Sequence, residues 1–174
     1  NETFRYVACK PNYYIAPTNK DKHGKELWNH HKMVKRTMFN YDGVEGGKTG
    51  YTTKAGGTLV TFAKRGDQEL IVVDLCAHGY ELYEDTIKML NYGFNNYKTI
   101  APFKTMNTVL KDDTYGFLKT GNELSPYKIP LKHLNDVTVM LEKNQSASKL
   151  AYKCKDNKYI ISYDGKQIGS VKLY

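Results

Sequence analysis

The sequence predicts an α+β fold, in which one helix covers an antiparallel sheet, followed by a small all-β, sandwich-like domain. Two strand-like runs, 57–64 and 69–76, come directly before a segment at 81–94 whose apolar residues have helical spacing. Beyond this helix the chain carries short runs of alternating apolar and polar residues, which are typical of strands. We therefore predict two regions, residues 1–100 and residues 101–174.

The two runs in the first region are predicted to pair as an antiparallel hairpin. Both are rich in apolar and β-branched residues, and the turn residues Arg65-Gly66-Asp67-Gln68 separate them. We expect both strands to be well buried.

The helix is predicted to begin at Glu81 and to end near Gly93, which we expect to act as a C-cap residue. Steps of about 3.6 residues place five side chains on one face, where they can cover the sheet. These are Leu82, Thr86, Ile87, Leu90 and Phe94.

The second region is predicted to consist of short strands. Residues 137–142 alternate apolar and polar side chains, and residues 159–163 and 169–174 flank the pair Asp164-Gly165. An Asp-Gly pair between alternating runs predicts a tight hairpin turn, because both central positions of that turn favour positive φ.

Composition excludes some classes of protein and leaves others open. The chain has 174 residues and 40% hydrophobic content, so it is long enough to fold, and a disordered chain is excluded. The net charge of +8 favours an acidic partner, which could be nucleic acid, anionic lipid or wall polymer. The longest aliphatic run, 70–73, is far shorter than the roughly 20 residues of a membrane span. No signal peptide is visible at the start.

Cysteine and histidine positions predict no metal site. Cys9, Cys76 and Cys154 lack the spacing of a zinc site, and we expect three free thiols. His30 and His31 should point to opposite sides of an extended chain, which makes them a poor metal pair. The fifteen tyrosines match no RNA-binding signature, so we expect no nucleic-acid partner.

A glycine-rich run at 41–52 surrounds Lys48 and contains the tripeptide Lys-Thr-Gly. This tripeptide is one of the motifs of penicillin-binding proteins and β-lactamases. By itself it is also compatible with a glycine-rich turn that carries a solvated lysine. A phosphate-binding loop is excluded, because Asp42 stands where that motif needs a glycine.

The wider context of the tripeptide is more specific. The stretch GVEGGKTGYTTKAGG at 43–57, followed by LVTFAKRGDQELIVVDL and then by MLNYGFNNY, resembles the serine-type D-alanyl-D-alanine carboxypeptidases, the low-molecular-mass penicillin-binding proteins. Residues 16–19 and 27–33 resemble the segment that leads into this strand. The resemblance implies that residues 1–100 are the C-terminal part of a penicillin-binding protein/β-lactamase-like catalytic domain, and that residues 101–174 are the β-rich C-terminal domain.

The resemblance also implies roles for residues of the Lys-Thr-Gly strand. The substrate peptide would lie antiparallel to residues 47–53 as an added strand. Lys48 would set the positive potential near the nucleophile, and Thr49 would bind the terminal carboxylate. Gly50 would allow close approach, and the backbone N–H of Tyr51 would be an oxyanion-hole donor.

The chain departs from the family pattern in its missing nucleophile. The family needs S-x-x-K and S-x-N before Lys-Thr-Gly, whereas the two S-x-x-K strings here, 125–128 and 146–149, follow it. We attribute both strings to chance, and no S-x-N occurs. We therefore expect the catalytic serine to lie outside this chain and the chain alone to be inactive. A second departure is Leu82, which stands where relatives commonly have an arginine.

The resemblance implies an enzyme that trims terminal D-alanine from peptidoglycan stem peptides through an acyl-enzyme, without cofactor or metal. Expected partners are stem peptides, β-lactams, and either the missing N-terminal half or a self-associated copy. The expected location is extracytoplasmic, in the cell envelope, with membrane attachment open. One alternative is a non-catalytic wall-binding module that uses its basic charge. Another is a β-lactamase, but β-lactamases lack a β-rich tail. Endopeptidases and transpeptidases share the same motifs.

Overall fold

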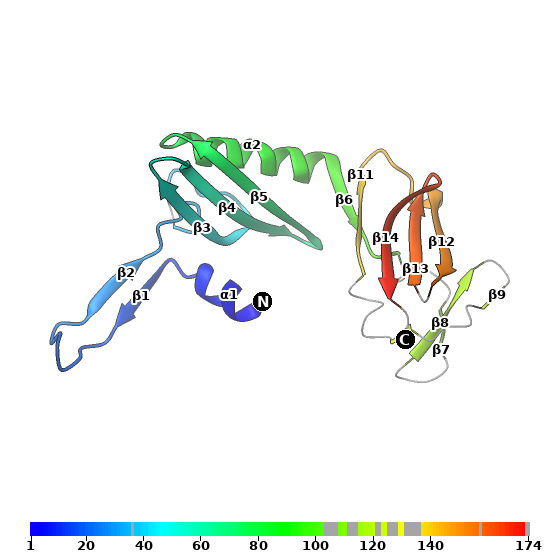
Figure 1. Ribbon diagram of the computed structural model, residues 1–174, viewed down its shortest axis with the longest axis horizontal. Coiled ribbons are helices and arrows are strands. Elements are labelled where there is room, and N and C mark those ends of the chain that lie inside the picture. The colour runs from blue at the N-terminus through cyan, green and yellow to red at the C-terminus, as the bar shows by residue number, and fades with distance from the viewer. Residues whose placement is uncertain are drawn as a thin grey trace. The chain divides into compact units, whose positions relative to one another are not determined.

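The computed structural model describes residues 1–35, 37–102, 108–110, 115–120, 123–124, 129–130, 137–156 and 158–172. The chain divides into two compact units, Asn1–Asn95 and Asn96–Tyr174. Figure 1 shows the elements of each unit. In the described part of the chain, no helix is both long enough and apolar enough to cross a membrane.

The first unit is built on an antiparallel sheet of β3 (Val44–Thr52), β4 (Gly56–Arg65) and β5 (Gln68–Ala77), in the order β3-β4-β5. The pairing of β4 with β5 confirms the predicted hairpin. The expectation that both strands are well buried is wrong for one face of the sheet. Ile71, Val73 and Leu75 are 72%, 54% and 68% exposed, because alternate residues of a strand point to opposite faces and one helix covers a single face.

Helix α2 (Glu81–Asn96) covers the other face of the sheet, as predicted (Figure 1). Leu59 and Val72 of the sheet are buried against this layer. The predicted C-cap role of Gly93 is wrong, because the helix continues through it to Asn96. A Cβ on Gly93 would lie 2.6 Å from Leu70 Cδ1, so the glycine allows close packing of helix on sheet. The buried side chains of α2 are Leu82, Tyr83, Thr86, Leu90 and Phe94.

Two elements before the sheet were not predicted from the sequence. Helix α1 (Glu2–Ala8) begins at Asn1, whose side chain accepts a hydrogen bond from the Phe4 N–H at 3.1 Å. A hairpin of β1 (Asn12–Ile15) and β2 (Lys25–Trp28) follows it. Neither strand sequence, NYYI or KELW, alternates apolar and polar residues, so no period of two marked them as strands.

The second unit is rich in strands, as predicted. β6 (Tyr97–Ile100) pairs with β11 (Val139–Glu142), in which Val139 and Leu141 are buried. The short 3-10 helix η2 (Ala147–Lys149) leads into a sheet of β12 (Leu150–Lys155), β13 (Lys158–Tyr163) and β14 (Lys166–Lys172). A further sheet contains β7 (Thr108–Leu110), β8 (Tyr115–Thr120), β9 (Glu123–Leu124) and β10 (Ile129–Pro130).

The turn between β13 and β14 confirms the Asp-Gly prediction. Asp164 and Gly165 have φ of 50° and 78°, so both central residues are in the left-handed region, which glycine and aspartate tolerate best.

Candidate active-site strand

β3 carries the predicted site residues on the edge of its sheet. It pairs with β4 on one side, and the described residues place no strand on its other side. The register sets Lys48 opposite Val60, Thr49 opposite Leu59, and Gly50 opposite Thr58. An open strand edge presents unpaired backbone N–H and C=O groups, so it can accept an extended peptide as an added strand.

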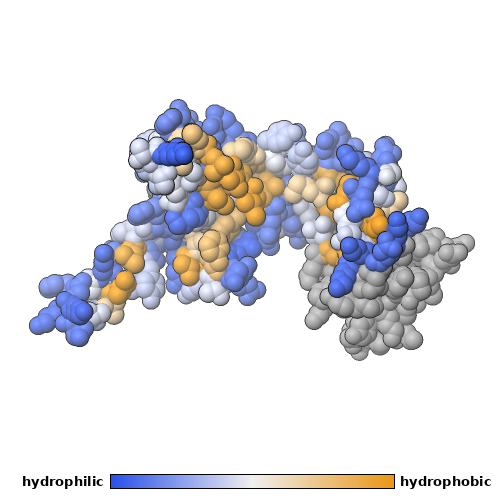
Figure 2. Space-filling view, in the orientation of Figure 1, coloured by the Kyte–Doolittle hydropathy of each residue, from blue (hydrophilic) through white to orange (hydrophobic). Residues whose placement is uncertain are grey.

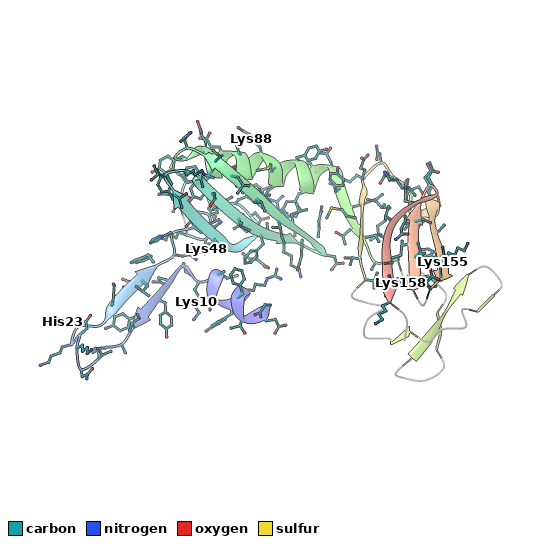
Figure 3. All side chains as sticks on the ribbon, in the orientation of Figure 1. Lys10, His23, Lys48, Lys88, Lys155 and Lys158 are labelled. Carbon is teal, nitrogen blue, oxygen red and sulfur yellow. The ribbon has the colours of Figure 1, made fainter. Side chains whose placement is uncertain are left out.

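Lys48 and Thr49 lie on opposite faces of the sheet. Directly paired residues of an antiparallel sheet share a face, so Thr49 lies with buried Leu59 and Lys48 lies with Val60, which is 37% exposed. The Lys48 ammonium donates a hydrogen bond to the carbonyl of Thr49. Among the ion pairs of the described residues, none involves Lys48. Lys48 therefore offers an uncompensated positive charge at the strand edge (Figure 3).

The glycines before Lys48 leave space that other atoms of the protein fill. A Cβ on Gly47 would lie 2.0 Å from the Val60 carbonyl oxygen and 2.7 Å from His31 Nε2. A Cβ on Gly46 would lie 2.7 Å from Phe62 Cζ and 2.9 Å from the Ala8 carbonyl oxygen. The structure therefore shows α1, β4 and His31 packed against these two glycines.

His31 lies directly behind β3 and is fully buried. Its Nε2 is 2.9 Å from Thr61 Oγ1 of β4, and its backbone N–H donates to Asn29 Oδ1 at 2.9 Å. Burial lowers the pKa of His31 from its ordinary 6.5 to about 4, because the charged imidazolium would lose its hydration. His31 is therefore neutral at physiological pH. His30, in contrast, is exposed.

The start of β3 is tied to α1 by an ion pair that the sequence did not reveal. Arg5 Nε donates to Glu45 Oε2 at 2.7 Å, and the Arg5 guanidinium also lies 3.4 Å from Glu69 of β5. The hydrogen bond that Arg5 donates to Glu45 raises the pKa of Arg5. The pKa of Glu69 is lowered, first by its hydrogen bond from Lys64. These side chains are partly exposed, so we expect the ion pairs to position α1 against β3 and to add little to the unfolding free energy.

The structure also locates the other residues that the sequence singled out. Leu82 is buried in α2, and it would touch a Cβ placed on Gly57 at 2.8 Å, so this side chain is part of the core. In the string 146–149, Ser146 caps η2 and the Lys149 ammonium pairs with Asp164 at 3.3 Å. This pairing supports the assignment of that string to chance. The string 125–128 lies outside the described residues.

The thiols of Cys9 and Cys76 are free, and burial raises the pKa of Cys9. The side chain of Cys154 lies outside the described part of the structure.

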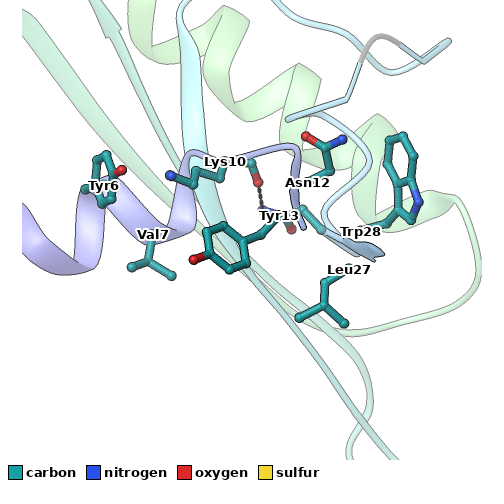
Figure 4. Close-up of a pocket in the computed structure, with 8 residues that line it drawn as sticks. Tyr6, Val7, Lys10, Asn12, Tyr13, Leu27 and Trp28 are labelled. Atoms are coloured by element: carbon teal, nitrogen blue, oxygen red, sulfur yellow. Dashed lines mark hydrogen bonds between the residues drawn. The ribbon is translucent and has the colours of Figure 1, made fainter. Parts of the chain in front are cut away.

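A pocket away from β3 lies between α1 and the β1–β2 hairpin (Figure 4). Its volume is about 470 Å³, and exposed aromatic side chains dominate its lining. No motif marked it in the sequence, because its residues are scattered over 6–29 and have no functional spacing. It is lined by Tyr6, Val7, Lys10, Asn12, Tyr13, Leu27, Trp28 and Asn29.

No protein-family model matches this chain. It is 29% identical over 154 residues to the D-alanyl-D-alanine carboxypeptidase DacF of Bacillus subtilis, which covers 86% of this chain and 37% of the relative. It is 35% identical over 77 residues to the D-alanyl-D-alanine carboxypeptidase DacC of Escherichia coli, over 44% of this chain and 18% of the relative. The matched parts are 37% of the first relative and 18% of the second, so they are well under half the length of either relative.

Two solved structures share the fold. Penicillin binding protein 5 of Haemophilus influenzae superposes with a TM-score of 0.60 at 22% identity, over 97% of this chain and 49% of that one. Penicillin binding protein 6B of Escherichia coli superposes with a TM-score of 0.54 at 19% identity, over 99% of this chain and 44% of that one.

Proposed function

We propose, from the confirmed resemblance of this chain to the D-alanyl-D-alanine carboxypeptidases, that it forms one wall of the active site of such an enzyme. The enzyme would remove the terminal D-alanine of peptidoglycan stem peptides. The open edge of β3, with Lys48 beside it, is the observation that carries the proposal.

We propose a role for each of three residues of the strand. The peptide would lie antiparallel along β3, with its backbone bonded to the open edge. The Lys48 ammonium would attract the carboxylate end and raise the positive potential at the reacting carbonyl. Thr49 would hydrogen-bond the carboxylate, and the Tyr51 N–H would stabilise the oxyanion.

The chemical step needs a serine, which we propose comes from a part of the protein outside these 174 residues. Its oxygen would attack the carbonyl of the D-alanyl-D-alanine bond, form an ester and release D-alanine. Water would then hydrolyse the ester and restore the serine. This scheme needs neither metal nor cofactor. A site in the cell envelope, outside the cytoplasm, would bring the enzyme to its substrate.

Labelling with a fluorescent penicillin tests this function in the full-length protein that contains this chain. We expect a covalent label in the wild type, and a labelling rate lowered roughly 100-fold or more by Lys48→Ala, because an active-site charge of this kind is lost. Lys54→Ala is the matched control, because it removes an exposed lysine from the turn that follows β3.

Labelling that is unchanged by Lys48→Ala would contradict the role of β3. An unlabelled wild type would contradict the enzyme assignment and leave the wall-binding alternative. In that alternative, binding to an anionic wall polymer depends on net charge, so Lys48→Ala and Lys54→Ala should weaken it equally.

A further inference from the structure

The pocket between α1 and the β1–β2 hairpin shares no residue with β3 and has no part in the proposed reaction. Its walls are aromatic and largely open to solvent, since Tyr6, Tyr13 and Trp28 are 65%, 57% and 54% exposed. Aromatic rings that stay exposed beside a cavity commonly mark a binding surface, because leaving them in water is unfavourable.

Two ammonium groups lie against these rings. Lys10 Nζ is 4.3 Å from the centre of the Tyr6 ring and 5.3 Å from that of Tyr13, and Lys35 Nζ is 5.4 Å from the Trp28 ring. Ring faces attract cations, so the aromatic rings hold both ammonium groups, and Lys10 itself lines the cavity. In the part of the chain that the structure describes, no ion pair neutralises Lys10 or Lys35.

Hydrogen bonds hold the walls together without a ligand. Asn29 Nδ2 donates to the carbonyl oxygens of Ala8 and Lys10 at 3.1 and 3.0 Å, and so ties the end of β2 to the end of α1. The Asn12 amide donates to Glu26 Oε1 at 2.9 Å, so the carboxylate at this edge of the hairpin is held by an amide. The pocket is therefore preformed, and one of the polar groups that it presents is the Lys10 ammonium.

We propose that this pocket binds a carboxylate-bearing ligand, with the carboxylate at Lys10 and a ring-shaped or apolar body stacked on Tyr13 and Trp28. The volume of about 470 Å³ suits a compact ligand of a few rings. The choice of probe rests on the proposed function, under which peptidoglycan fragments carry both sugar rings and peptide carboxylates.

Trp28 supplies the readout, because it is the one tryptophan of the 174 residues. The protein is titrated with N-acetylmuramyl-L-alanyl-D-isoglutamine, which carries one carboxylate, and with its methyl ester, which carries none. We expect a saturable change in Trp28 emission with the acid, and binding weakened about tenfold or more with the ester. Trp28→Phe should abolish the signal and thereby identify its source.

Variants test the role of the charge. Lys10→Ala should weaken binding of the acid about tenfold or more and leave the weak binding of the ester unchanged. Lys20→Ala removes a lysine from the turn of the same hairpin, outside the pocket, and should change neither.

Three results would overturn the proposal. One is the absence of a saturable response, and another is equal binding of acid and ester. The third is a failure of acrylamide to quench Trp28 emission in the free protein, because another segment or a second copy would then fill the pocket. Penicillin labelling is independent of these readouts, so failure of the pocket and failure of the enzyme assignment are distinguishable.

Discussion

His31 is the residue whose position best explains how β3 is held. Its buried ring fills the space beside Gly47, and Nε2 reaches Thr61 on the next strand. Nδ1 is buried without a hydrogen-bond partner, so a second proton on the ring would find no acceptor there. Tyr83 meets the ring edge-on, with ring centres 6.1 Å apart. The site therefore favours the neutral imidazole.

This preference predicts that the protein loses stability in weak acid. In the unfolded chain His31 binds a proton below its ordinary pKa of 6.5, whereas in the folded protein it stays neutral down to about 4. The unfolded state then holds more protons, so the stability is complete above the higher pKa and is lost as the pH falls toward the lower one. The loss of unfolding free energy should reach about 3 kcal/mol.

Urea unfolding at about pH 7 and about pH 4.5 measures this loss. His31→Gln is the comparison, because the amide can still bond Thr61 but does not titrate. Glu69, whose pKa is lowered by Lys64, also contributes less to the unfolding free energy in acid. This contribution is the same in wild type and variant, so it cancels when the two proteins are compared. Equal pH dependence in the two proteins would contradict the role of His31.

At the scale of elements, the position of β3 depends on glycine. A Cβ on Gly47 would meet the Val60 backbone and the His31 ring at distances that real Cβ atoms do not adopt, so β3 would have to move. We expect Gly47→Ala to destabilise the protein by about 2 kcal/mol or more, as overpacking does in a tight core. It should also reduce penicillin labelling, since Lys48 moves with the strand.

The control for this substitution is Gly169→Ala in β14. A Cβ there would lie 4.0 Å from Ile161 Cδ1, which is an ordinary contact. Its unfolding free energy should stay within about 1 kcal/mol of wild type. If Gly47→Ala unfolds like wild type, β3 tolerates a side chain at this position and the packing argument fails.

At the scale of the whole molecule, the sheet of the first unit has one covered face and one open face. Figure 2 shows apolar residues gathered over this sheet. The open face carries Val60, Ile71, Val73 and Leu75, which are between 37% and 72% exposed. A contiguous apolar surface of this kind favours association.

We therefore expect the 174-residue chain, produced by itself, to bind the dye ANS and to elute as an oligomer in size-exclusion chromatography. The double substitution Ile71→Ser and Val73→Thr should lower both signals. Ile168→Ser, which changes an exposed isoleucine of the second unit, should not. A wild-type chain that is monomeric and binds no dye would contradict this prediction.

The sequence by itself predicted several features that depend on neighbouring residues, although it missed α1 and the β1–β2 hairpin. The hairpin of β4 and β5, the apolar face of α2, the alternation in β11 and the turn at Asp164-Gly165 all follow from local periodicity or turn chemistry. The Lys-Thr-Gly strand and its context also indicated the relationship to the carboxypeptidases before any comparison.

The tertiary structure decided what depends on contacts between distant residues. The edge position of β3, the ion pair between Arg5 and Glu45, the burial of His31 on Gly47 and the packing of Gly93 on Leu70 join positions that no local pattern connects. The pocket beside Trp28 has the same origin. Close packing selects these contacts from the whole folded chain, and a period of two or 3.6 residues carries no information about them.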